Sequence, residues 1–213
     1  MMRGQFITLE GSEGAGKSTA LKFIENYLQQ HNIMAVLTRE PGGTEIAEEI
    51  RHVLLYPASK DKMQPLTELL LMFAGREQHI QTCIKPALVA GQWVVSDRYV
   101  DASYAYQGGG RGIPVTTIAL LDKLIVNEIY PNLTLLLDIP AEIGVDRAEK
   151  RGNAKDRIEQ EKVEFFKRVR DAYLERAKQD PSRIKIIDAS QPLESVQQQI
   201  QQALDEFMKR VAA

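Results

Sequence analysis

The sequence has very little cysteine, because Cys83 is the only one among its 213 residues. A single cysteine excludes an internal disulfide and cannot build a cysteine-based metal site, which fits a reducing compartment. Long apolar runs are also missing: the longest, residues 69–74, is far too short to span a bilayer, and no secretory segment precedes the first predicted strand. We therefore expect a cytoplasmic protein with no membrane partner.

An excess of charge of either sign is missing as well. The net charge of −2 and the isoelectric point near 6.0 give no bulk electrostatic attraction to nucleic acid or to an anionic membrane, so we expect a small substrate. The chain contains no internal repeat and no linker rich in proline, glycine or serine. With 44% hydrophobic residues it can bury a full core, and we expect residues 1–213 to form a single domain.

Segments rich in β-branched and aliphatic residues alternate with segments of helical period. We expect strands at 5–9, 33–38, 92–96, 133–138 and 183–188, and helices at 17–30, 44–55, 66–90, 114–128, 141–150, 159–179 and 192–211. Such alternation predicts an α/β fold of three layers, a five-stranded parallel sheet with helices on both faces. A ligand would then bind at the carboxyl ends of the strands.

Residues 11–18 read Gly-Ser-Glu-Gly-Ala-Gly-Lys-Ser between a predicted strand and a predicted helix, the pattern of a phosphate-binding loop, or P-loop. The glycines let backbone N–H groups converge on phosphate oxygens, and the helix presents the positive end of its dipole. Lys17 would reach the β- and γ-phosphates, and the Ser18 hydroxyl can ligate Mg²⁺. A turn that binds nothing is the alternative, but it does not need Lys-Ser after its last glycine. We expect a nucleoside triphosphate here.

Two further motifs follow predicted strands. After the third strand, Asp97 can hold Mg²⁺ directly or through water, and Arg98 can bind a second phosphate through two hydrogen bonds; a surface ion pair is the alternative. After the second strand, residues 39–44 form a rigid turn into a helix. Glu40 and Arg51 could face a phosphate acceptor there, unless they are a helix cap and a surface arginine.

Two stretches have the composition of an acceptor site. On the helix at 66–90, Phe73 can stack on a base and Arg76 can donate to its carbonyl oxygen, although a core residue with a surface arginine is the alternative. Residues 101–112 hold more glycines, tyrosines and hydrogen-bonding side chains than a plain surface loop needs. We expect both stretches to contact the acceptor.

A basic stretch at about residues 147–158 carries Arg147, Arg151 and Arg157 around a break at Gly152. Arg147 and Arg151 share a helical face, being four residues apart. Basic residues on a segment that contains glycine predict a lid that closes over phosphates and excludes water; a solvated basic face is the alternative.

In this order the motifs resemble those of bacterial thymidylate kinases, P-loop nucleoside-monophosphate kinases, over essentially the whole chain. The residues that carry the resemblance are 11–18, 39–44, 97–99, 106–112 and 156–159. The resemblance implies a P-loop kinase fold with a short lid, and a homodimer that binds ATP and dTMP. It also implies transfer of the γ-phosphoryl group of MgATP to dTMP, giving dTDP for dTTP synthesis, with Mg²⁺ as cofactor.

The resemblance also assigns site residues. The residues expected to bind ATP are Gly11, Ser12, Glu13, Gly14, Ala15, Gly16, Lys17, Ser18, Thr19, Arg147 and Gln191, and those expected to hold the metal are Ser18 and Asp97. The residues expected to bind dTMP are Glu40, Arg51, Met72, Phe73, Arg76, Arg98, Ser103, Tyr106 and Gln107. The residues expected to take part in catalysis are Lys17, Arg98, Arg151, Asp97 and Glu13. Arg51 and Arg98 would hold the dTMP phosphate. Arg76 and Gln107 would read the thymine edge, Tyr106 would crowd the ribose 2′ position, and Ser103 would line the base pocket. Arg147 would lie against the adenine, with the loop at Gln191 on its other side.

The sequence departs from the family's usual pattern at the base. The thymine-stacking phenylalanine usually stands four residues before the arginine, where this chain has Met72, and Phe73 is one position later. One residue turns a regular helix by about 100°, so either Met72 covers the base or the helix is locally shifted.

The source of the catalytic arginine also follows from the resemblance. Some members carry an arginine inside the P-loop, where this chain has Gly14. The lid must then supply the positive charge that stabilises the transferring phosphoryl group, with Arg151 as first choice and Arg157 as the alternative.

Two rival functions remain open. One is a kinase for another small acceptor, such as a deoxynucleoside or a different monophosphate; Arg51 and Arg98, both directed at phosphate, favour an acceptor that is already phosphorylated. The other is a nucleotide-dependent switch. A guanine-specific switch would carry an Asn-Lys-x-Asp motif, and residues 153–156 have the wrong order.

Overall fold

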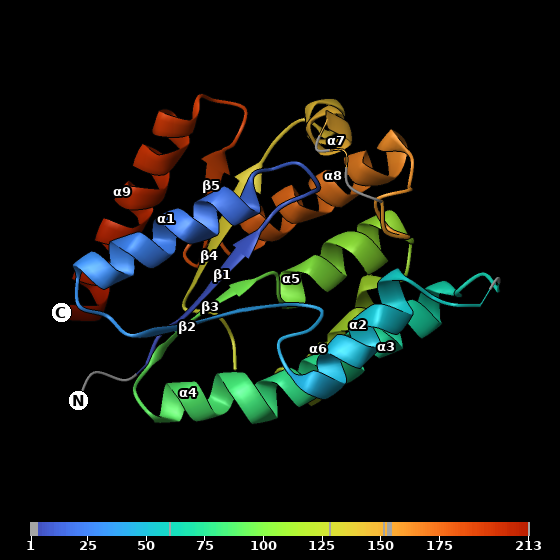
Figure 1. Cartoon of the computed structure of the whole chain (residues 1–213), viewed down its shortest axis with the longest axis horizontal. Helices are drawn as coiled ribbons and strands as arrows, with labels where there is room; N and C mark the ends of the chain where they lie inside the picture. The colour runs from blue at the N-terminus through green and yellow to red at the C-terminus, as the bar shows by residue number, and fades with distance from the viewer. Residues whose placement is uncertain (1–3, 60, 128, 151, 153–154, 213) are drawn as a thin grey trace.

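A computed structural model describes residues 4–59, 61–127, 129–150, 152 and 155–212. In this part of the chain five strands form one all-parallel sheet in the order β2-β3-β1-β4-β5 (Figure 1). The strands are β1 (Phe6–Glu10), β2 (Ala35–Arg39), β3 (Trp93–Asp97), β4 (Leu133–Asp138) and β5 (Ile184–Asp188). The predicted strands and the parallel sheet are confirmed. β1, β3 and β4 are buried almost throughout, as expected of central strands that are covered on both faces.

Helices cover both faces of the sheet. Their bounds are α1 (Lys17–Gln30), α2 (Glu45–Leu55), α3 (Pro65–His79), α4 (Lys85–Val89), α6 (Val115–Ile125), α7 (Ala141–Lys150), α8 (Val163–Gln179) and α9 (Leu193–Ala212). Figure 1 shows α1 and α9 side by side on one face. No helix in the described ranges is both long and apolar enough to cross a membrane.

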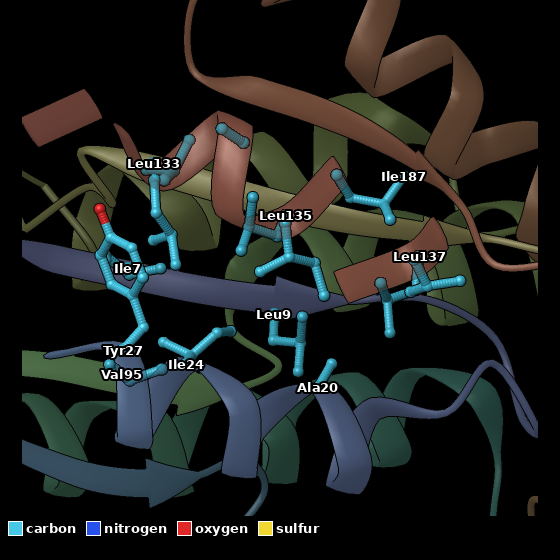
Figure 2. Packing of buried hydrophobic residues seen from close by; sticks show 14 of the residues in the cluster. Ile7, Leu9, Ala20, Ile24, Tyr27, Val95, Leu133, Leu135, Leu137 and Ile187 are labelled. Carbon is cyan, nitrogen blue, oxygen red and sulfur yellow. The ribbon is translucent and has the colours of Figure 1, made fainter. Parts of the chain in front are cut away.

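The main hydrophobic core lies between this helix pair and the sheet. Ile24 of α1 packs towards Leu9 of β1, and Tyr27 of α1 lies beside Ile7 of the same strand (Figure 2). Leu135 of β4 and Ile187 of β5 belong to the same buried cluster. Neighbouring strand residues point to the opposite face, where they meet α3, α6 and α8 in two further buried clusters. This packing fixes where each strand ends, and therefore where the site residues lie.

The segment after β3 is helical, although its sequence does not predict a helix. It forms α5 (Val100–Ser103) and then a wider π-helical turn, η2 (Tyr104–Gly110). Consecutive glycines disfavour a helix in isolation, but here they let it lie directly on α8. A Cβ atom at Gly109 would stand 2.6 Å from the Arg168 carbonyl oxygen, and one at Gly110 would stand 2.5 Å from the Phe165 ring. Tertiary packing therefore overrides local propensity.

The long helix predicted at 66–90 is continuous but irregular. α3 runs into a π-helical segment, η1 (Ile80–Ile84), which continues as α4. A π-helical turn inserts an extra residue into the helical repeat, and such turns occur frequently at functional sites. Here it begins directly after His79, a residue that contacts the site described below.

Candidate functional site

The carboxyl ends of the strands bring the predicted motifs together. The glycine-rich loop follows β1, residues 39–44 follow β2, and residues 97–99 follow β3, the strand between those two. The predicted motifs line two cavities at this edge of the sheet. We call them the loop groove and the helix cleft.

The loop groove has a volume of about 850 Å³, including the space open to solvent at its mouth. It is lined by Glu13, Gly14, Gly16, Lys17, Ser18, Thr19, Asp97, Arg98 and Arg147. The other predicted loop residues, Gly11, Ser12 and Ala15, are buried beneath it. Gly16 stands at the start of α1 with a φ of 90°, a left-handed conformation that glycine adopts without strain. The structure thus gathers most of the predicted triphosphate residues around one groove.

Lys17 is buried at the floor of this groove. Its Nζ donates to the carbonyl oxygens of Gly11 at 3.3 Å and Ser12 at 3.1 Å. Burial lowers the pKa of Lys17, and the nearby charge of Arg98 lowers it further. An anion in the groove would therefore stabilise the charged form of Lys17 and raise its pKa.

The loop is packed directly against the backbone of α7. Gly14 has a φ of 71°, and a Cβ atom there would stand 2.0 Å from the carbonyl oxygen of Gly144. In the other direction, a Cβ atom at Gly144 would stand 2.4 Å from the carbonyl oxygen of Glu13. No side chain fits at either position with the two backbones at this distance. The contact places α7, and with it Arg147, beside the loop.

Asp97 and Ser18 offer a place for a metal ion. Both line the loop groove, and Oδ1 of Asp97 is buried without a hydrogen-bond partner. Within the described residues there is no group of three or more histidine, cysteine, aspartate or glutamate side chains that could hold a metal. One carboxylate and one hydroxyl suit Mg²⁺, which usually completes its shell with water and substrate phosphates rather than with a protein cage.

Arg147 lines the loop groove, whereas Gln191 lies in the loop after β5 that Arg147 contacts. Arg147 Nη1 donates to the carbonyl oxygen of Ala189 at 3.0 Å, which ties α7 to the loop after β5. Gln191 follows in that loop, is exposed, and donates to Asp188 Oδ2 at 2.8 Å. Arg151 lies outside the described residues.

Arg157, the alternative lid arginine, is placed elsewhere. Its Nε donates to the Leu54 carbonyl oxygen at 2.8 Å, and its Nη1 stands 2.8 Å from Glu68 Oε2. These contacts turn the guanidinium towards α2 and α3, away from the loop groove. Arg157 is therefore a poor candidate for the charge that meets the transferring phosphoryl group.

The helix cleft has a volume of about 500 Å³, including its open mouth. It is lined by Glu13, Glu40, Pro41, Arg51, Leu55, Met72, Arg76, Arg98, Tyr99, Ala102, Ser103, Tyr106, Gln107, Asp156 and Ile158. These include all the residues predicted to bind the acceptor except Phe73. Leu55 lies outside every predicted motif, while Ala102 and Ile158 lie within the stretches 101–112 and 156–159 but were given no role of their own. All three side chains are apolar and carry no signal beyond helical or core packing.

Phe73 corrects one expectation. Its side chain is 1% exposed and packs in a hydrophobic cluster, whereas Met72 lines the cleft. The Arg76 guanidinium stands 4.6 Å from the centre of the Phe73 ring, so the phenylalanine supports the arginine from the core. The regular turn of α3 carries position 73 away from the cleft, which leaves Met72 to cover whatever binds there.

Arg98 lies between the two cavities and lines both, as does Glu13. Its Nη2 donates to Glu13 Oε1 at 2.7 Å and to the Tyr106 hydroxyl at 2.8 Å. Arg98 has a φ of 69°, a strained conformation for an arginine. Its backbone is held by the Leu9 carbonyl oxygen, which accepts from its N–H at 2.9 Å, and by the Ser96 hydroxyl, which donates to its carbonyl oxygen at 2.7 Å. The fold thus fixes this guanidinium at the junction.

Arg51 brings a second cation to the cleft. Its Nη1 donates to the Pro41 carbonyl oxygen at 2.7 Å. Burial lowers the pKa of Arg51, and the charges of Arg39 and Arg98 lower it further. An anion between Arg51 and Arg98 would offset this repulsion, so the cleft favours a negatively charged ligand.

Arg76 is held in one orientation at the base of the cleft. Its Nε donates to Glu40 Oε2 at 2.7 Å, its Nη1 to Ser103 Oγ at 3.0 Å, and its Nη2 to the Tyr99 carbonyl oxygen at 3.0 Å. A guanidinium has five N–H donors, so two remain for a ligand. Glu40 and Ser103 thus position Arg76, in addition to lining the cleft themselves.

His79 supports Glu40 from behind and was not predicted. Burial lowers the pKa of His79, but hydrogen bonds with the Cys83 thiol and the Glu40 carboxylate outweigh this and raise it to about 9. The imidazole is therefore charged at neutral pH and donates from both nitrogens, to Glu40 Oε1 at 2.9 Å and to Thr38 Oγ1 at 2.7 Å. A single histidine in a polar helical stretch carries no signal in the sequence that would predict this contact.

Comparison with known proteins decides the family. Residues 9–200 match the thymidylate kinase family. The chain belongs to the thymidylate kinase family. It is 56% identical over 200 residues to a thymidylate kinase of Vesicomyosocius okutanii, covering 94% of this chain and 97% of that protein. It is 52% identical over 206 residues to that of Alcanivorax borkumensis, covering 97% and 98%.

A solved thymidylate kinase structure agrees with this fold. The crystal structure from Ehrlichia chaffeensis superposes with a TM-score of 0.77 at 33% identity, covering 95% of this chain and 98% of that one. As a member of the thymidylate kinase family, the protein is an enzyme, a kinase of nucleotide biosynthesis. The sequence-based expectation of a P-loop kinase fold is confirmed.

Proposed function

We propose that the protein transfers the γ-phosphoryl group of MgATP to dTMP and releases dTDP and ADP, a step in dTTP synthesis. The observation that carries this proposal is the junction at Arg98 and Glu13, which line the loop groove and the helix cleft together. A donor in one cavity and a phosphorylated acceptor in the other would bring their phosphates to this junction. Phosphoryl transfer requires mainly positioning and charge neutralisation from the protein.

ATP would occupy the loop groove, with residues 11–18 as its P-loop. Backbone N–H groups and Lys17 would hold the β- and γ-phosphates, while Thr19, Arg147 and Gln191 would lie towards the nucleoside. Ser18 and Asp97 would hold Mg²⁺, and the buried Oδ1 of Asp97, which has no hydrogen-bond partner, supports that assignment. When bound, the ion would neutralise phosphate charge.

dTMP would occupy the helix cleft. Arg51 and Arg98 would bind its phosphate, and Tyr106, held by Arg98, would stand near the ribose 2′ position. Arg76 and Gln107 would read the thymine edge, with Met72 over the base. The two donors of Arg76 that its partners leave available suit a carbonyl oxygen of thymine. Arg151 as the catalytic residue of a lid at 147–158 stays a prediction from the sequence, as do the single domain and the cytoplasmic location.

The acceptor assignment predicts pyrimidine selectivity. In a coupled assay of ADP release, dTMP should be preferred, dUMP should be used less well, and purine monophosphates should not be used, because Arg76 and Gln107 would face the base in a closed pocket. ADP release without any acceptor is the control, and it also measures ATP hydrolysis of the kind a nucleotide switch performs. Comparable kcat/KM values for dGMP and dTMP would contradict the assignment.

We also propose that the protein forms a homodimer through the outer face of α2, α3 and α6. Large apolar side chains are exposed there: Ile46, Val53, Leu66, Leu70, Leu120 and Leu124. α2 and α6 both pack against α3, so the three helices form one layer (Figure 1). A second copy would cover this surface. Sedimentation of the protein should give twice the mass of one chain, and a monomer at all concentrations tested would contradict the proposal.

A further inference from the structure

Glu68 of α3 lies behind the helix cleft and does not line it. Its side chain is 1% exposed, and it contacts three groups from other parts of the chain. Oε1 accepts from Gln107 Nε2 at 2.8 Å, and Oε2 accepts from Arg111 Nε at 3.1 Å and stands 2.8 Å from Arg157 Nη1. Gln107 is 1% exposed and does line the cleft. Glu68 therefore meets the ligand only through Gln107.

The two arginines keep Glu68 ionised. Burial raises the pKa of Glu68, but the hydrogen bond from Gln107 and the charges of Arg111 and Arg157 outweigh this and hold it below its ordinary value. An ionised carboxylate accepts hydrogen bonds and cannot donate them. Gln107 must therefore turn its amide nitrogen towards Glu68.

This contact decides what Gln107 can offer to a ligand. A primary amide carries its oxygen on the other side of the group from its nitrogen, so the oxygen remains for the cleft. A carbonyl oxygen accepts a hydrogen bond from a ring N–H, such as N3–H of thymine. It opposes a ring nitrogen that is itself an acceptor, such as N3 of cytosine, and a buried pair of facing acceptors is costly.

We propose that Glu68 is a positioning residue that locks the Gln107 amide in one orientation and so makes the cleft select bases with a ring N–H at position 3. The selectivity rests on the proposed binding of dTMP in the helix cleft. Arg76 adds to it independently, because its guanidinium only donates and therefore opposes the 4-amino group of cytosine.

The test replaces Glu68 by glutamine, which can both accept and donate and therefore lets the Gln107 amide turn over. The ratio of kcat/KM for dTMP to that for dCMP should fall by about tenfold or more, the range expected for one buried polar mismatch. Part of this fall should come from better use of dCMP. A purely structural role would lower both values together and leave the ratio unchanged.

Arg111→Gln is the matched control. It removes one charge partner of Glu68 but keeps Arg157 beside the carboxylate and keeps the contact between Glu68 and Gln107, so the ratio should stay near that of the unaltered protein. A folded Glu68→Gln protein with an unchanged ratio would overturn the proposal. Failure of the unaltered protein to use dTMP would instead overturn the proposed function.

A second measurement needs no variant at position 68. In the unaltered protein, one Nε2 proton of Gln107 should exchange with solvent much more slowly than those of Gln198, which is exposed. Gln107→Asn would assign the resonance. Equal exchange rates for the two glutamines would overturn the proposal even if Glu68→Gln failed to fold.

Discussion

Replacement of Lys17 by methionine should lower kcat by about 100- to 1000-fold while the protein stays folded. The reason for the loss is that the lysine charge would contact the phosphoryl group in the transition state of its transfer. Removal of one such contact has an effect of this size. The reason for the intact fold is that burial lowers the pKa of Lys17, so the folded protein disfavours its charge. A methionine of similar length carries no charge and therefore removes the free-energy cost of burying one.

The measurement is kcat from ADP release at saturating ATP and dTMP, together with the thermal unfolding midpoint. Lys22→Met is the matched control, since Lys22 lies on the same helix, has a side chain that is 69% exposed, and pairs with Glu25. Its kcat should be unchanged. Near-normal kcat in a folded Lys17→Met protein would refute the assignment of the phosphate-binding loop.

Replacement of Arg98 by alanine should lower kcat/KM for dTMP by about 100- to 1000-fold, with a smaller change in KM for ATP. Arg98 would hold the acceptor phosphate through charge-assisted hydrogen bonds, which are about twice as strong as neutral ones. Its loss also leaves the Glu13 carboxylate at the junction without the guanidinium that now binds it at 2.7 Å. With one positive charge fewer at the junction, the two phosphates would approach each other less readily.

The measurement compares KM and kcat for each substrate in turn. Arg39→Ala is the control: Arg39 also stands at the carboxyl end of a strand, but its side chain is 55% exposed and pairs with Glu48. Arg98→Lys should recover only part of the activity, because an ammonium keeps the charge without the planar pair of donors. A selective rise in KM for ATP in Arg98→Ala would reverse the allocation of the two phosphate sites.

The sequence predicted the sheet from local patterns, and most of the lining residues from motifs and from the resemblance to the family. Apolar runs identified the strands, and parallel strands align their carboxyl ends, so motifs far apart in the chain could be placed together without a structure. Position 72 shows the limit of this reasoning. The sequence left open whether Met72 or Phe73 covers the base, and the observed phase of α3 places Met72 in the cleft.

The residues that the sequence did not reveal act through tertiary contacts. Glu68 and His79 lie behind Gln107 and Glu40, and their partners come from other elements. A lone glutamate or histidine on a helix has many surface explanations, and only packing brings each one to its partner. The η2 segment was missed for the same reason, since its glycines are favourable only against α8.

The contact between Gly14 and Gly144 limits how this enzyme can change during evolution or by engineering. An arginine in the glycine-rich loop would bring a positive charge close to bound phosphates, but a side chain at position 14 would enter the space of the α7 backbone. The loop would have to be transferred together with a helix that stands further away. Two segments that are distant in sequence must therefore change together, and a single substitution at position 14 cannot place an arginine in the loop.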